Sequence, residues 1–239
     1  MSLRSDYDLW HSRNQNLDPA HDDGSSPWYA WVREVLPDVK GLRILEVACG
    51  RGGFVSSLAR SGALAYGMDF SFAAIQVAKQ KTSSENCVSP ICLLQGDAHA
   101  LPFTDGYFDT VISCETIEHL PTPMKALREF HRVTRTGGTL ILTTPNYLNL
   151  MGLYEIYSKF RHPQRVKDQP FDRIQFFFQT RSLLKAAGWN ILQSDGTVHQ
   201  LPIFPGRNPV QVRSLENNRK IRKLLSIFAY HYCLIAKKI

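Results

Sequence analysis

From Leu42 onward, hydrophobic residues fall into short runs that alternate with amphipathic stretches. The runs cover residues 44–47, 64–68, 91–94, 108–113 and 140–143. Between them, apolar residues recur at the three-to-four spacing of helices over residues 54–60, 73–81 and 124–133. Nearly continuous apolar strands that alternate with helices predict a mostly parallel sheet covered on both faces. Right-handed crossovers make this a doubly wound, Rossmann-like α/β fold.

The two ends of the chain break this alternation. Residues 1–26 are polar, with Tyr7 and Trp10 as large exceptions, and we predict a flexible arm there. Ser26 and Pro27 have the chemistry of a helix start, and the helix should end before Pro37. Residues 27–239 are then expected to form a single domain, a size that can bury one substantial core.

Residues 146–178 also depart from the strand–helix alternation and are predicted to be an insert. Apolar residues at helical spacing are followed there by a basic loop bounded by prolines and by three consecutive phenylalanines. Next we expect a helix capped by Thr180 and closed by Gly188, strands at 191–198 and 228–236, and a basic helix at 215–225.

Composition narrows the class of protein. With 44% hydrophobic and 21% charged residues, the chain is neither collagen-like, disordered nor coiled coil. The net charge of +7 permits an acidic partner, but too few aromatic residues lie among the basic ones for nucleic-acid recognition. Five cysteines without a CxxC pair predict neither a disulfide framework nor a metal site. The absence of a signal sequence and of a ~20-residue apolar run predicts a cytoplasmic protein.

The turn after the first predicted strand is rich in small residues. Glu46 ends this buried strand, and Gly50, Gly52 and Gly53 lead into a helix. Small residues let a ligand lie against the backbone, and the helix N–H groups point toward it. In an open parallel sheet, the carboxyl ends of the strands are where ligands bind.

Acidic residues end the next two strands. Asp69 follows Gly50 by 19 residues, and Asp97 ends the third strand. A carboxylate at the position of Asp69 can accept both hydroxyls of a ribose. Three acids at successive strand ends therefore predict a nucleoside site.

Two nucleoside cofactors fit this pattern. Ala48, Gly50 and Gly53 match the GxGxxG fingerprint of nicotinamide cofactors in part. Glu46 opposes that interpretation, because its carboxylate would repel a pyrophosphate but could pair with an ammonium group. S-adenosylmethionine carries an ammonium and a sulfonium and no phosphate, so the charges favour it.

Taken together, the motifs resemble those of class I S-adenosylmethionine-dependent methyltransferases. The segments that carry the resemblance are 46–52, 68–71, 96–98, 108–112, 137–142 and 183–189. Residues 113–120, with Glu115 and His119, resemble the quinone-biosynthesis branch of that family. The resemblance implies a seven-stranded sheet whose last strand inserts antiparallel.

The resemblance also implies roles for individual residues. Ala48, Cys49, Gly50 and Gly52 would contact the methionine part, with Glu46 on its ammonium, and Glu115 would also contact the cofactor. Asp69 would bind the ribose, Phe70 would lie beside the adenine, and Asp97 and Ala98 would read the adenine edge. Ala48 replaces the family's usual glycine, and its methyl group is expected to be tolerated in an ordinary backbone conformation. No metal is expected.

The acceptor is expected to be a small molecule, apolar or anionic, methylated by in-line displacement with S-adenosylhomocysteine as product. Oxygen is favoured over carbon or nitrogen, and His119 is the candidate general base. The insert at 146–178 would cap the acceptor, and its 147–165 segment could touch a membrane surface. Two alternatives stay open: a nicotinamide-dependent oxidoreductase, and a family member that binds the cofactor without catalysis. The oligomeric state is not predicted.

Overall fold

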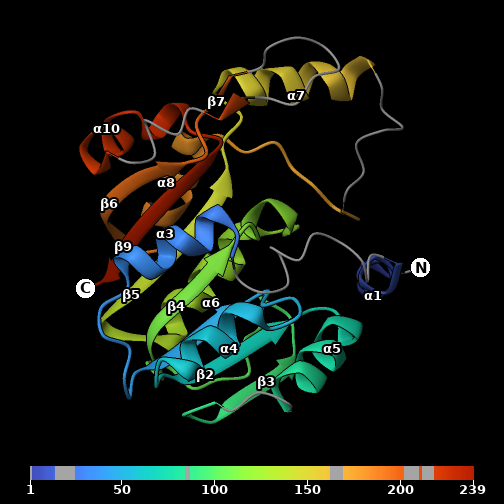
Figure 1. Cartoon of the computed structure of the whole chain (residues 1–239), viewed down its shortest axis with the longest axis vertical. Coiled ribbons are helices and arrows are strands. Elements are labelled where there is room, and N and C mark those ends of the chain that lie inside the picture. The colour runs from blue at the N-terminus through green and yellow to red at the C-terminus, as the bar shows by residue number, and fades with distance from the viewer. Residues whose placement is uncertain (1, 14–24, 84–86, 162–168, 202–209, 212–217) are drawn as a thin grey trace.

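The computed structural model describes residues 2–13, 25–83, 87–161, 169–201, 210–211 and 218–239, which are arranged around a seven-stranded sheet (Figure 1). The strand order is β3-β2-β1-β4-β5-β9-β6. Neighbouring strands among the first five are parallel, and β9 is antiparallel to both β5 and β6. The strands are β1 (Arg43–Val47), β2 (Leu64–Asp69), β3 (Ile91–Gln95), β4 (Phe108–Cys114), β5 (Thr134–Pro145), β6 (Trp189–Thr197) and β9 (His231–Lys238). This arrangement confirms the expected doubly wound sheet with an antiparallel last strand.

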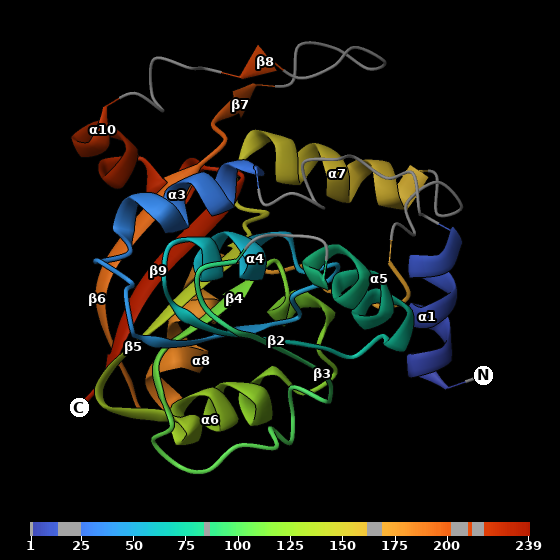
Figure 2. The same ribbon diagram turned by 60° about the horizontal axis from the view of Figure 1, so that its bottom comes forward.

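Helices cover both faces of the sheet (Figure 2). One face carries α3 (Pro27–Val35), α4 (Gly53–Arg60) and α5 (Phe72–Ser83), and the other carries α6 (Pro123–Val133) and α8 (Phe177–Ala186). The remaining elements are α1 (Leu3–Arg13), η1 (Ile117–His119), α7 (Leu150–Arg161), the strand pair β7 (Gln200–Leu201) and β8 (Val210–Gln211), α10 (Arg219–Leu224) and η2 (Ser226–Phe228).

Each central strand contributes to two hydrophobic cores. In β4, Val111 packs into the core beneath α6 and α8, and its neighbour Ile112 packs into the core beneath α3, α4 and α5. In β1, Leu45 likewise packs into the core beneath α6 and α8, and Ile44 packs into the core beneath α3, α4 and α5. Since successive side chains of a strand point to opposite faces, a strand covered on both sides needs the apolar runs seen in the sequence.

Two local expectations differ from the structure. Residues 3–13 form helix α1 where a loose arm was predicted. Helix α8 begins at Phe177 rather than after Thr180, because the side chain of Gln179 accepts a hydrogen bond from the Phe176 amide and closes the first turn earlier. The sequence also predicts a proline-rich loop at 202–209; this segment and the start of the predicted basic helix, at 215–217, lie outside the described residues.

Within the described residues, no helix combines the length and apolar character needed to cross a membrane. The domain boundaries drawn from the sequence stay predictions.

Candidate functional site

A cavity of about 1190 Å³ opens at the carboxyl ends of β1, β2, β3 and β4. These strands flank the point where the strand order reverses, between β1 and β4, which is where ligands bind in doubly wound sheets. Most residues singled out in the sequence line it: Ala48, Cys49, Gly50, Asp69, Phe70, Asp97, Ala98, Glu115 and His119. Glu46 and Gly52 are not among its lining residues.

The turn after β1 has an unusual backbone. Ala48, Gly50 and Gly52 all have positive φ angles, of 59°, 52° and 75°. The condition for tolerating the methyl group of Ala48, an ordinary backbone conformation, is therefore not met, because the left-handed region costs a residue with a Cβ atom about 1–2 kcal/mol. A Cβ atom added at Gly50 would meet nothing within 4 Å, so the backbone there is open to a ligand.

Asp69 ties the first two strand ends together. Its Oδ2 accepts a hydrogen bond from the Gly50 amide at 2.8 Å, and its Oδ1 accepts one from the Ser71 amide at 2.9 Å. Burial raises the pKa of this carboxyl group, and hydrogen bonds from the backbone oppose the shift. Each oxygen keeps a lone pair for a further donor, such as a ribose hydroxyl.

Glu46 lies behind the turn rather than in the cavity wall. It is 1% exposed, and the hydroxyl of Tyr29 donates to its Oε1 at 2.7 Å. Among the residues that the structure describes, none forms a hydrogen bond with its buried Oε2 atom. Burial raises the pKa of Glu46 to about 8. An ammonium group, reached directly or through water, would supply the missing partner, so this residue fits the methionine end of S-adenosylmethionine.

The buried state of Glu46 predicts a pH dependence of stability. Its pKa in the folded chain, about 8, lies above its ordinary value of 4.5, so the folded protein holds a proton that the unfolded chain releases between these pH values. The stabilisation is complete below about pH 4.5 and is lost as the pH rises through 8, by up to about 1.4 kcal/mol per unit. Glu46→Gln should flatten this part of the profile, measured by urea unfolding from pH 5 to 8.5. Parallel profiles for the two proteins would show that Glu46 does not titrate in this range.

At the end of β3, Asp97 is paired with a residue that sequence reasoning missed. Its Oδ1 accepts from the His99 amide at 2.9 Å and lies 2.6 Å from His99 Nδ1. Burial alone would raise the pKa of Asp97, but the hydrogen bonds from His99 lower it below its usual value. Asp97 therefore stays ionised beside the cavity, as a carboxylate that accepts from an adenine amino group must.

The loop after β4 brings several titratable groups together. His119 Nδ1 lies 2.7 Å from the carbonyl oxygen of Phe171. Since a carbonyl only accepts, Nδ1 carries the proton. The Nε2 atom lies 3.6 Å from Oε1 of Glu118, which is 1% exposed. Burial raises the pKa of Glu118 well above its ordinary value, and the charge of Glu115 adds to the shift.

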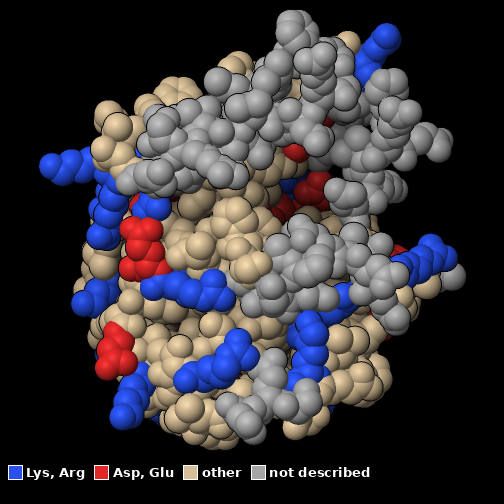
Figure 3. Space-filling model, viewed as in Figure 1, with Lys and Arg blue, Asp and Glu red and all other residues tan. Residues whose placement is uncertain are grey.

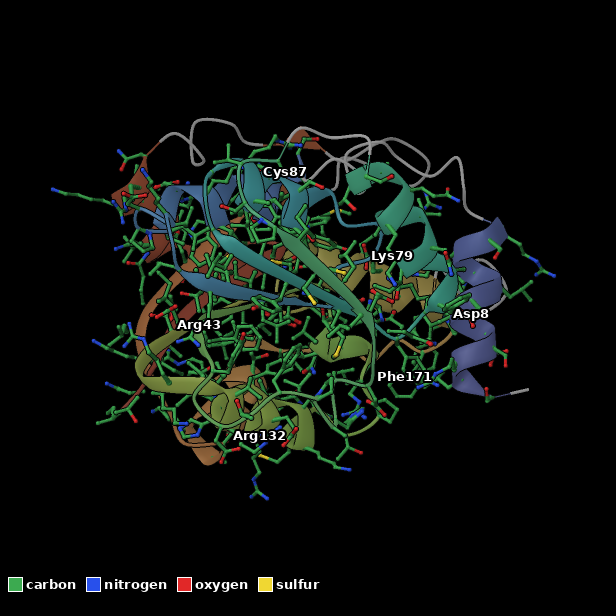
Figure 4. The ribbon with its side chains drawn as sticks, turned by 90° about the horizontal axis from the view of Figure 1, so that it is seen from below. Asp8, Arg43, Lys79, Cys87, Arg132 and Phe171 are labelled. Carbon is green, nitrogen blue, oxygen red and sulfur yellow. The ribbon has the colours of Figure 1, made fainter. Side chains whose placement is uncertain are left out.

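Helix α1, unforeseen from the sequence, forms one wall of the cavity. The carboxylate of Asp8 accepts from the Ser71 hydroxyl at 2.7 Å and from the Ala73 amide at 3.2 Å, so it caps α5 from outside (Figure 4). Arg4 lies over the ring of Phe70, and Tyr7 meets that ring edge-on. The spacing of Tyr7 and Trp10, three residues apart and both on the cavity, is the signal that could have indicated this helix.

In the part of the chain that the structure describes, no three His, Cys, Asp or Glu side chains are grouped to hold a metal ion.

The comparisons with known proteins agree with this geometry. Residues 45–142 match the family model described as a methyltransferase domain. A demethylmenaquinone methyltransferase of Staphylococcus aureus is 33% identical over 142 residues, which are 56% of this chain and 58% of the relative. The chain thus spans less than two thirds of the curated relatives that it matches.

Two crystal structures have the same fold. One is an S-adenosylmethionine-dependent methyltransferase from Thermotoga maritima, titled a possible histamine N-methyltransferase, with a TM-score of 0.72, 17% identity and full coverage of both chains. The other is magnesium protoporphyrin IX methyltransferase from Synechocystis with bound S-adenosylhomocysteine, with a TM-score of 0.65, 18% identity and coverage of 99% and 98%. The sheet topology, the positions of the motifs and the matched family model all indicate the same fold. Over residues 45–142 the chain matches a methyltransferase domain, and its fold is that of S-adenosylmethionine-dependent methyltransferases of known structure.

Proposed function

We propose that this chain binds S-adenosylmethionine in the cavity at the strand ends and transfers its methyl group to a small-molecule acceptor. The observation that carries the proposal is the hydrogen bond of 2.8 Å from the Gly50 amide to Asp69, beside the unpartnered oxygen of Glu46. This arrangement places the carboxylate of Asp69, which can accept hydrogen bonds from a ribose, next to the open backbone of the turn and the buried carboxyl group of Glu46. The cofactor contacts would come from Glu46, Ala48, Cys49, Gly50, Gly52, Asp69, Phe70, Asp97 and Ala98.

The same contacts disfavour a nicotinamide cofactor. A pyrophosphate needs donors from the glycine turn, but the Gly50 amide already donates to Asp69. Negatively charged phosphates would keep Glu46 from ionising, whereas an ammonium group would favour its carboxylate form. A cationic methionine end meets neither obstacle.

The chain's own contribution to the reaction is alignment. When bound, S-adenosylmethionine supplies a methyl group on a positively charged sulfur, which a nucleophile displaces in line. Trp28, Tyr29 and Leu120 give the cavity an apolar wall beyond Glu115, where an acceptor can lie. Holding donor and acceptor in line can supply up to ~7–11 kcal/mol of the acceleration.

The acceptor we propose is a small aromatic molecule with a nucleophilic hydroxyl, with a quinone-type compound as the first choice. The named activity of the Staphylococcus aureus relative supports the quinone-type acceptor, whereas the choice of a hydroxyl as the methylated group is part of the proposal alone. The test incubates the chain with methyl-labelled S-adenosylmethionine and chemically reduced demethylmenaquinone, with histamine as a second acceptor, and follows S-adenosylhomocysteine. Formation of S-adenosylhomocysteine only when the quinol is present supports the proposal. Cofactor binding without turnover on any acceptor would favour the non-catalytic alternative, and thermal stabilisation by NAD alone would favour the oxidoreductase.

We further propose that the protein is cytoplasmic and that α7 contacts an anionic membrane surface. Five exposed apolar side chains follow one another at helical spacing and form the α7 stripe: Leu150, Leu153, Tyr154, Tyr157 and Phe160. The buried residues Met151 and Gly152 lie on the other side of the helix. On the face shown in Figure 3, Lys and Arg side chains are spread widely, so charge would assist contact without forming one dense patch. The predicted contact segment, 147–165, extends beyond the described residues at 162–165.

Liposome flotation tests the α7 stripe. The double variant Leu153→Gln, Phe160→Gln should lose most of its binding to vesicles that contain phosphatidylglycerol, because both side chains are more than half exposed in the stripe. Leu192→Gln is the matched control, since Leu192 is similarly exposed on β6. Equal flotation of the wild type and the double variant would rule out the contact.

A further inference from the structure

Glu115 has a strained and well-supported position that the sequence did not predict. It directly follows β4 at the cavity and has a φ angle of +48°, although it is not a glycine. Its amide donates to the carbonyl oxygen of Thr143 at 3.0 Å, which holds the backbone in this conformation. Strained residues that the surrounding structure holds in place gather at functional sites.

The carboxylate of Glu115 is oriented from two sides. The hydroxyl of Thr143 donates to its Oε1 at 2.7 Å, and Nδ1 of His231 lies 2.9 Å from its Oε2. Thr143 comes from β5 and His231 from the start of β9, so neighbouring strands fix both oxygens. Because a carboxylate only accepts, Nδ1 of His231 carries the proton.

His231 is itself held in place. It is buried, and its ring lies 4.9 Å from that of Trp28, measured between centroids. Trp28 lines the cavity, whereas His231 does not. His231 therefore contacts two cavity-lining residues, Glu115 and Trp28, without lining the cavity itself.

We propose that Glu115 accepts the proton of the acceptor's hydroxyl during methyl transfer, and that His231 is the positioning residue that aims its carboxylate. This inference rests on the proposed function. The acceptor's O–H proton passes to a carboxylate oxygen of Glu115 while an oxygen lone pair forms the new bond to the methyl carbon. The carbon–sulfur bond breaks, and its electron pair stays on sulfur. The acceptor thus belongs to the class of neutral alcohols or phenols, which carry a proton to be lost.

Neighbouring groups are less suited to this task. Glu118 is 1% exposed and is not among the residues that line the cavity, so it does not face an acceptor there. Nε2 of His119, the base that the sequence predicted, faces Oε1 of Glu118 at 3.6 Å while Nδ1 donates to the Phe171 carbonyl, so this ring is oriented toward Glu118. Two thiols and two phenols among the described residues also interact with Glu115: Cys114, Cys233, Tyr147 and Tyr230. Burial raises the pKa of each of them.

Glu115→Gln tests the proposal, because it keeps the shape of the side chain and removes its capacity as a base. We expect kcat to fall by about 100-fold or more, with little change in the affinity for S-adenosylhomocysteine measured by calorimetry. A kcat within about threefold of the wild-type value would overturn the proposal. Loss of S-adenosylhomocysteine binding would also overturn it, in favour of the cofactor contact that the sequence predicted for Glu115.

His231 variants separate positioning from simple support of the fold. The side-chain amide of Asn can donate from nearly the position of Nδ1, so His231→Asn should recover most of the kcat that His231→Ala loses, while KM stays similar. Nitrogen NMR of labelled histidine gives a readout without turnover: the Nδ1-protonated signal of His231 should shift in Glu115→Gln. Equal kcat in the two His231 variants, or an unchanged signal, would contradict the positioning role. Absence of wild-type turnover on every acceptor would instead count against the proposed function.

Discussion

Asp69→Asn should lower the affinity for S-adenosylhomocysteine at least about 100-fold. The Asp69 carboxylate would bind the ribose, and it also accepts the hydrogen bond that holds the turn at Gly50. Hydrogen bonds to a charged group contribute about 1.5–3 kcal/mol each, so two lost ribose contacts account for this effect. An asparagine can accept from only one of the Gly50 and Ser71 amides, because its NH₂ group would face the other. Isothermal titration calorimetry measures the change, and circular dichroism confirms that the sheet is retained.

Asp105→Asn is the matched control for this experiment. It also removes one carboxylate, but Asp105 is largely exposed and pairs with Arg132 on the surface. Its effect on binding should be negligible, because exposed ion pairs contribute little. Wild-type affinity in Asp69→Asn would refute the assignment of the ribose site.

Arg222→Ala should destabilise the protein by about 3–5 kcal/mol, because it leaves the buried charge of Asp195 without its cationic partner. Arg222 donates to Asp195, which is fully buried, at 3.2 Å, and to both oxygens of Glu34 at 2.8 Å. Asp195 also accepts from Trp31 Nε1 at 3.1 Å. This network joins α10, β6 and α3. Urea unfolding of the variant should show a large fall in the midpoint.

Arg219→Ala provides a control on the same helix. Arg219 lies 3.8 Å from the same Glu34, but its side chain is 58% exposed. Its removal should cost less than about 1 kcal/mol, because solvent screens such pairs. Similar losses from the two variants would mean that burial does not decide the strength of this network. Since α3 carries Trp28 and Tyr29 into the cavity wall, Arg222→Ala should also weaken ligand binding.

Much of the fold could be predicted from local patterns alone. The apolar runs correspond to β1 through β5, because a strand covered on both faces must be apolar at successive positions. The helices α4, α5 and α6 appear where the three-to-four spacing placed them. The carboxyl ends of parallel strands share one edge of a sheet, so the order of motifs was enough to bring Gly50, Asp69 and Asp97 to one cavity.

Such local patterns could not predict contacts between segments that lie far apart in the sequence. Glu115 and His231 are 116 positions apart, and only the antiparallel insertion of β9 beside β5 brings them to 2.9 Å. Tertiary packing likewise decides three other features. It places Asp8 at the start of α5, turns Glu46 toward Tyr29 and holds Ala48 in a left-handed backbone conformation. The sequence by itself determined which residues are buried in each element, because burial leaves a local period. Only the tertiary structure decided which side chains meet, because partners far apart in the chain leave no periodic trace.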